Sequence, residues 1–127
     1  MNLNQITIPV ANLQRAIAFY QVLGLRLIVH AAPHYARFEC PEGDTTFSLH
    51  LAEPPLCHSG VWIYFETAQL DKLVQALQAE GIVFESQPQD QSWLWREARL
   101  KDPDGHQLIL YYAGENRKSP PWRLTDQ

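Results

Sequence analysis

The feature of this 127-residue sequence that most constrains its fold is an internal repeat. Three positions of the first half align with three of the second half at a constant separation of 57, as the pairs Leu13 and Leu70, Gly24 and Gly81, and Leu25 and Ile82. The later turn glycines, Gly43 and Gly105, are 62 positions apart, so the second copy carries five extra residues. The sequence therefore predicts two copies of the order strand, helix, strand, strand, strand.

In the first copy, strands are predicted at 3–10, 25–30, 35–40 and 46–51 from their apolar residues, which alternate with polar ones most clearly in the first strand. Asn12 is placed to cap a helix, and Gly24 is placed to end it. The apolar residues of that helix recur at helical spacing: Leu13, Ala16, Ile17, Tyr20 and Leu23. A proline-rich linker is expected at 53–60.

In the second copy, strands are predicted at 61–66, 82–85, 93–101 and 107–112, with a loop at 87–90. The helix carries Leu70, Leu73, Val74 and Leu77 on one face, and Gly81 ends it. Between the last two strands, Asp102-Pro103-Asp104-Gly105 predicts a tight turn, because Pro103 presets its own φ and Gly105 accepts a positive φ.

Composition limits the function classes. A net charge of −4 without a basic run argues against nucleic acid as a partner. No apolar stretch is long enough to cross a membrane, and the N-terminus lacks the pattern of a secretion signal, so we expect no membrane partner and a cytoplasmic location. Cys40 and Cys57 are expected to be free thiols, with a disulfide as the alternative.

Several short motifs resemble the vicinal oxygen chelate superfamily, which includes glyoxalases, bleomycin-resistance proteins and extradiol dioxygenases. The motifs are Ile6-Thr7-Ile8-Pro9-Val10, Ala18-Phe19-Tyr20, Leu23-Gly24-Leu25, Phe65-Glu66 and Asp102-Pro103-Asp104-Gly105-His106. The resemblance implies an α+β fold in which two tandem βαβββ modules form a curved mixed sheet around a cavity. It further implies one domain over 1–127, with modules at 3–53 and 60–113, a proline-rich tail at 114–127, and a homodimer.

Strand alternation assigns the strand residues to two faces. One face is apolar and is expected to lie under the helices. The opposite face is polar and aromatic, and is expected to line the cavity: Gln5, Thr7, Tyr35, Arg37, Glu39, Ser48, His50, Trp62, Tyr64, Trp95, Glu97, Arg99, Ile109 and Tyr111. Such a surface is typical of a small-molecule site. The residues expected to bind a ligand are Gln5, Thr7, Arg37, Ser48, Trp62, Tyr64, Trp95, Ile109 and Tyr111.

The resemblance also allows a test for a divalent metal. In metal-dependent relatives, the ligand positions correspond here to Gln5, Ser48, Trp62 and Ile109. An amide oxygen of Gln5 can bind a metal, a protonated Ser48 binds poorly, and Trp62 and Ile109 offer no lone pair. We therefore expect no metal cofactor; the alternative is a rearranged set in which His50 combines with Gln5 and Glu97.

Two function classes follow. The preferred one is a metal-independent protein that binds a small molecule, anionic or aromatic, through aromatic stacking or the guanidinium groups of Arg37 and Arg99. For these arginines we expect pairing with Glu39 and Glu97 inside the protein, with ligand binding as the alternative. The other class is a metal-dependent lyase or dioxygenase, for which His50, Glu97 and Arg99 are the catalytic candidates.

Overall fold

The predicted repeat is present in the computed structural model as two four-stranded sheets, each accompanied by one helix. The structure describes residues 1–56 and 60–125; Cys57 and part of the predicted linker lie outside this range. The chain divides into two units, which we call unit 1 and unit 2. Unit 1 contains residues 1–59 and the turn 102–105, and unit 2 contains 60–101 and 106–127.

Unit 1 consists of β1 (Gln5–Val10), α1 (Leu13–Leu23), β2 (Arg26–Ala31), β3 (Tyr35–Glu39) and β4 (Thr46–Leu51). Its strands lie in the order β1-β4-β3-β2, with β1 and β4 parallel and the other neighbours antiparallel. The pairing places Thr7, Ser48 and Arg37 in one row across the sheet.

Unit 2 consists of β5 (Trp62–Glu66), α2 (Leu70–Ala79), β6 (Gln89–Asp90), β7 (Arg96–Lys101), β8 (Gln107–Tyr112) and the 3₁₀ turn η1 (Gly114–Arg117). Its strands lie in the corresponding order β5-β8-β7-β6, and β5 and β8 are parallel. The same topology in both units confirms the repeat predicted from the sequence.

The helix boundaries follow the predicted capping residues. The side chain of Asn12 accepts a hydrogen bond from the backbone N–H of Arg15, and Gly24 has the left-handed φ of 108° that ends α1. Gly81, with a φ of 94°, follows α2 in the same way. The apolar strand faces are buried as predicted, at Ile8, Val10, Ala36, Phe38, Phe47 and Leu49 in unit 1 and Ile63, Ala98, Leu100, Leu108 and Leu110 in unit 2.

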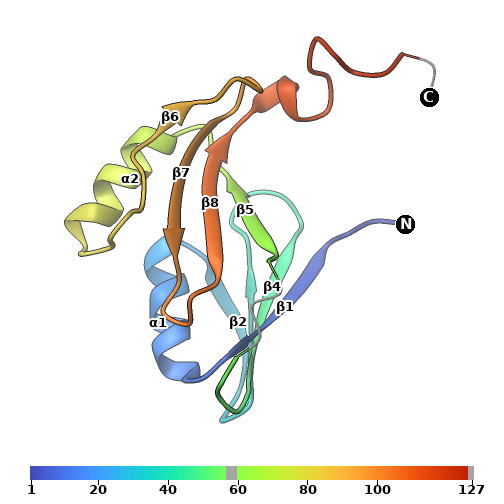
Figure 1. Ribbon diagram of the computed structural model, residues 1–127. Helices are drawn as coiled ribbons and strands as arrows, with labels where there is room; N and C mark the ends of the chain where they lie inside the picture. The colour runs from blue at the N-terminus through green and yellow to red at the C-terminus, as the bar shows by residue number, and fades with distance from the viewer. Residues whose placement is uncertain (57–59, 126–127) are drawn as a thin grey trace. The chain divides into compact units, whose positions relative to one another are not determined.

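The turn between β7 and β8 belongs to unit 1, where it lies against α1 (Figure 1). The hydroxyl of Tyr20 donates to the Asp102 carboxylate over 2.6 Å, and both side chains are buried. Burial and the carboxylates of Asp102 and Asp104 raise the pKa of Tyr20, so the phenol remains a donor. Asp104 Oδ1 accepts from the backbone of Ala11 and from Arg15, so three hydrogen bonds hold the turn in place.

Three segments differ from the prediction. Residues 82–85 form no strand, because the N–H groups of Glu85 and Ser86 both point to the single carbonyl of Arg99 and build no regular ladder. The strand predicted at 93–101 begins only at Arg96, because Leu94 has a left-handed φ of 67° in a turn. The predicted loop 87–90 contains β6, and the tail expected to lack a helix begins with η1.

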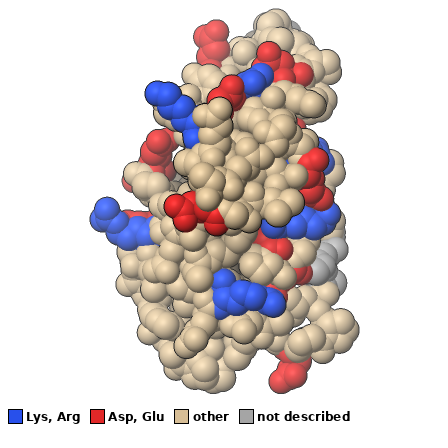
Figure 2. Space-filling model, turned by 90° about the vertical axis from the view of Figure 1, so that its left-hand side faces the viewer, with Lys and Arg blue, Asp and Glu red and all other residues tan. Residues whose placement is uncertain are grey.

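Three further observations concern the surface charge, the helices and Cys40. On the face shown in Figure 2, acidic and basic side chains are interspersed, without an extended basic area. Within the described residues, no helix combines the length and the apolar character needed to cross a membrane. Cys40 is a free thiol, and burial raises its pKa.

Candidate functional site

The predicted site residues lie in both units, and we describe each sheet separately. Unit 1 carries Gln5, Thr7, Arg37, Ser48 and His50, and unit 2 carries Trp62, Tyr64, Trp95, Glu97, Arg99, Ile109 and Tyr111. The catalytic candidates are thus divided, with His50 on β4 and both Glu97 and Arg99 on β7.

In unit 1, hydrogen bonds join the polar side chains of β1, β3 and β4. The amide nitrogen of Gln5 donates to Ser48 Oγ over 2.8 Å and to Thr7 Oγ1 over 3.0 Å. Its amide oxygen accepts from the hydroxyl of Thr46. Gln5 and Ser48, two positions at which metal-dependent relatives carry ligands, therefore bind each other in this protein.

Tyr35 extends this network and was not among the predicted ligand-binding residues. Its hydroxyl lies 2.7 Å from Ser48 Oγ, and Arg37 Nε donates to it over 2.9 Å. Desolvation alone would raise the pKa of Tyr35, but the hydrogen bonds with Ser48 and Arg37 and the charge of Arg37 outweigh it and lower the pKa. The sequence signal was the alternation that places Tyr35 and Arg37 on one face of β3.

The expected pairing of Arg37 with Glu39 is wrong. Glu39 lies 3.5 Å from Arg26 on the neighbouring strand β2 instead. The pairing register explains this, because Arg26 is directly opposite Glu39. Among the described residues, no carboxylate lies within 4.0 Å of the Arg37 guanidinium. His50, opposite Tyr35 in the register, is exposed.

In unit 2, three aromatic side chains form a cluster. Trp95 stacks on Tyr111 with ring centroids 4.7 Å apart, and Tyr64 meets both rings edge-on, at 5.7 Å and 5.3 Å. Ile109 is fully buried in the adjoining core cluster with Tyr111 and Ala113, against which Trp95 packs. Of the cluster, Tyr64 is the ring that is exposed at the surface.

Arg99 lies beside this cluster, over the ring of Trp62. Its guanidinium carbon is 4.6 Å from the Trp62 ring centroid, within the range of a cation–π contact. Trp62 is 52% exposed, so this contact lies at the surface. Within the part of the chain that the structure describes, no carboxylate lies within 4.0 Å of the Arg99 guanidinium, and the expected pairing of Arg99 with Glu97 is wrong.

Glu97 has a different partner, which the sequence did not reveal. Its Oε2 accepts a hydrogen bond from the indole N–H of Trp93 over 2.7 Å, and the residue is only 2% exposed. The left-handed turn at Leu94 brings Trp93 back toward Glu97, and a prediction of continuous strand could not show this. Desolvation first, and then the charge of Glu97, raise the pKa of Tyr64, while Arg99 opposes them.

The donor set does not fit the metal that the resemblance implies. Trp62 and Ile109 carry no lone pair that could bind a cation, and the amide oxygen of Gln5 is engaged by Thr46. Among the described residues, no three His, Cys, Asp or Glu side chains gather closely enough to hold a metal ion.

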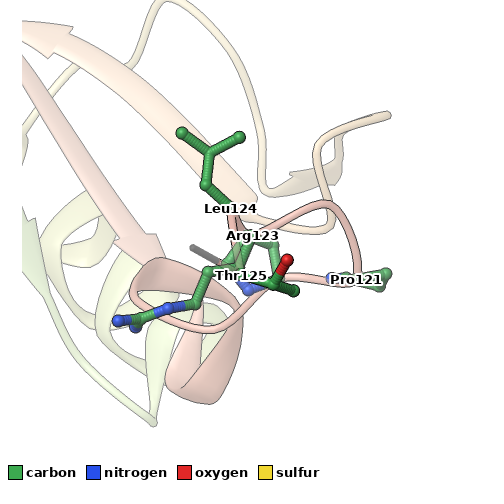
Figure 3. A pocket seen from close by; sticks show the side chains of 5 residues that line it. Pro121, Arg123, Leu124 and Thr125 are labelled. Carbon is green, nitrogen blue, oxygen red and sulfur yellow. The ribbon is translucent and has the colours of Figure 1, made fainter. Parts of the chain in front are cut away.

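Two surface hollows are lined by other residues. One, of about 330 Å³, is formed by the tail alone, from Pro120, Pro121, Arg123, Leu124 and Thr125 (Figure 3). The other lies at the start of α2. Trp122 is 57% exposed, so the tail does not bury this side chain against unit 2.

Comparison with protein-family models gives a match over most of the chain. The family model of the Glyoxalase/Bleomycin resistance protein/Dioxygenase superfamily matches residues 2–110. A search of curated proteins gave no match.

Among solved structures, three illustrate the likeness. A glyoxalase/bleomycin resistance protein/dioxygenase from Nocardioides is 23% identical, with a TM-score of 0.76 over 98% of this chain and 90% of that one. A lactoylglutathione lyase from Agrobacterium tumefaciens is 18% identical, with a TM-score of 0.72 over 97% of both chains. A family enzyme from Burkholderia phytofirmans PsJN is 19% identical, with a TM-score of 0.73 over 89% of this chain and 99% of that one. At these identities the likeness shows the fold.

Proposed function

Because the chain belongs to the Glyoxalase/Bleomycin resistance protein/Dioxygenase superfamily, we propose that it binds a small planar organic acid without the metal of its metal-dependent relatives. The site that we propose is the aromatic face of unit 2, formed by Trp62, Tyr64 and Arg99. The observation that carries the proposal is the Arg99 guanidinium, whose carbon lies 4.6 Å from the centroid of an exposed tryptophan ring, with no carboxylate of the described residues within 4.0 Å.

The chemistry of this face suits such a ligand in two ways. Exposed indole and phenol rings offer flat apolar surface for stacking, which contributes about 0.5–1.5 kcal/mol per aromatic pair. A guanidinium group offers paired N–H donors in the geometry of a carboxylate. Glu97 accepts from Trp93, and Glu85, whose pKa the charge of Arg99 helps to lower, is paired with Lys101. Because no described carboxylate lies within 4.0 Å of the Arg99 guanidinium, its N–H groups can donate to a bound acid.

Isothermal titration with benzoate tests the proposal, with benzamide as the neutral comparison. We expect Arg99→Ala to weaken benzoate binding roughly ten-fold, the lower range for a partly exposed charge-assisted hydrogen bond, and to leave benzamide binding almost unchanged. Trp62→Ala should weaken both ligands about three- to ten-fold, because stacking does not depend on charge.

Arg96→Ala is the matched control, since it removes a cation from the same strand that is already paired with Asp71 and Asp90. Equal loss of benzoate affinity in Arg96→Ala and Arg99→Ala would show a general charge effect and contradict the proposed site.

The metal-free part of the proposal has its own test. Protein treated with a chelator should bind benzoate as tightly as untreated protein, and Ni²⁺, Zn²⁺, Mn²⁺ or Fe²⁺ should not bind stoichiometrically. Tight binding of one metal that His50→Ala abolishes would instead support a metal-dependent lyase or dioxygenase.

A further inference from the structure

The polar network of unit 1 has a fixed direction, which follows from the side chain of Gln5. Its amide nitrogen contacts the backbone carbonyl of Ile6 at 3.1 Å, and a carbonyl can only accept. The nitrogen end of the amide is therefore identified, and Gln5 must be the donor in its 2.8 Å hydrogen bond to Ser48 Oγ.

The direction of the next hydrogen bond follows from Ser48, which is completely buried. If Tyr35 donated to Ser48, the serine oxygen would accept twice, and the serine proton would have no acceptor among the described residues. A buried hydroxyl proton without an acceptor is costly. Ser48 therefore donates to Tyr35, and the hydroxyl oxygen of Tyr35 accepts from both Ser48 and Arg37 Nε.

This arrangement leaves the hydroxyl proton of Tyr35 available for another molecule. The guanidinium of Arg37 lies over the Tyr35 ring, 5.5 Å from its centroid, and only its Nε donates a hydrogen bond to Tyr35. The two terminal nitrogens remain available as donors, since no carboxylate of the described chain lies within 4.0 Å. Glu39, the acidic residue two positions along the strand, is held by Arg26. The face thus presents three donors and one positive charge at neighbouring positions of β3.

We propose that Tyr35 and Arg37 form a carboxylate-binding site on the sheet of unit 1. One carboxylate oxygen would accept a hydrogen bond from the Tyr35 hydroxyl, and the other would accept one from a terminal N–H of Arg37. Both are charge-assisted hydrogen bonds, which are stronger than neutral ones. Gln5 and Ser48 position the Tyr35 hydroxyl. The site is assigned from residues of unit 1 alone, and none of them belongs to the aromatic face of unit 2.

Acetate is the probe, titrated at constant ionic strength with chloride as the reference anion, and NMR signals of Arg37 Nε–H and the Tyr35 ring are the readout. We expect both signals to shift in a saturable way with acetate. Tyr35→Phe should weaken binding about three- to ten-fold by removing one donor, and Arg37→Lys should weaken it at least as much.

Three outcomes would overturn the assignment: identical shifts with chloride, unchanged affinity in both variants, or saturation by inorganic phosphate but not by acetate. Trp62→Ala should leave acetate binding at Arg37 unchanged, so this experiment can succeed or fail separately from the benzoate experiment. Both tyrosine and arginine substitutions retain the size of the side chain, and circular dichroism confirms that each variant folds.

Discussion

Replacing Tyr20 with phenylalanine removes one hydrogen bond from the core of unit 1 and little else. The Tyr20 side chain is completely buried, and its hydroxyl lies 2.6 Å from the Asp102 carboxylate. A hydrogen bond to a charged group contributes about 1.5–3 kcal/mol to stability, and phenylalanine preserves the ring packing against Phe38 and Phe47. We therefore expect Tyr20→Phe to lower the free energy of unfolding by about 1.5–3 kcal/mol.

Urea unfolding followed by circular dichroism measures this loss, and hydrogen exchange locates it. The backbone N–H of Ala11 donates to Asp104 in the same turn, so its exchange should accelerate roughly 10- to 100-fold if Tyr20 holds the turn against α1. Tyr112→Phe is the control, because Tyr112 lies at the surface.

A double-mutant cycle with Asp102→Asn separates the hydrogen bond from other effects of the two substitutions. The losses in free energy of unfolding of the two single variants should be clearly non-additive, since either substitution weakens the same hydrogen bond. A loss below about 0.5 kcal/mol in Tyr20→Phe, or additive losses in the cycle, would refute the conclusion that this contact anchors the turn.

Three further predictions concern the polar network, the buried carboxylate and the tail. Arg37→Ala should raise the pKa of Tyr35, which is measured from phenolate absorbance. In the unsubstituted protein this pKa is lower in the folded state than in the unfolded state. The ionised phenol therefore stabilises the fold only at alkaline pH, and this stabilisation is lost as the pH falls through the folded-state pKa. Trp93→Phe should destabilise the protein by about 1.5–3 kcal/mol in urea unfolding, because it leaves the buried Glu97 without its indole donor; an unchanged midpoint would contradict this. Truncation after Ser119 should leave the melting temperature unchanged, because Trp122 is exposed, and a fall would show that the tail stabilises the fold.

The fold could be predicted because its signals are local. Asn12 and Gly24 set the ends of α1 through their own backbone chemistry, and alternation separated the buried faces of the strands from the exposed ones. Residues 82–85 were mispredicted because their sequence favours an extended chain, whereas a strand also needs a partner that offers a regular ladder. Such partners depend on contacts distant in the sequence.

The candidate site was predicted as a face but not as a set of contacts. Alternation placed Arg37 and Glu39 on one face of β3. The register with β2, however, puts Arg26 directly opposite Glu39, and Glu39 forms its ion pair with Arg26. Trp93 reached Glu97 only because the chain turns at Leu94, and no residue there marks a left-handed conformation. Sequence patterns thus specify which side a residue occupies, and register and turns decide its partner.

The place of the turn 102–105 in unit 1 has a consequence for synthesis of the chain on the ribosome. Sheet and helix of unit 1 emerge first, but Asp102 and Asp104, which bind Tyr20, Ala11 and Arg15, emerge only after all strands of unit 2 except β8. A nascent chain that ends at residue 101 therefore holds a first unit that still lacks these three hydrogen bonds. Completion of the N-terminal unit must wait for the C-terminal part of the chain, so the two repeats cannot mature strictly one after the other.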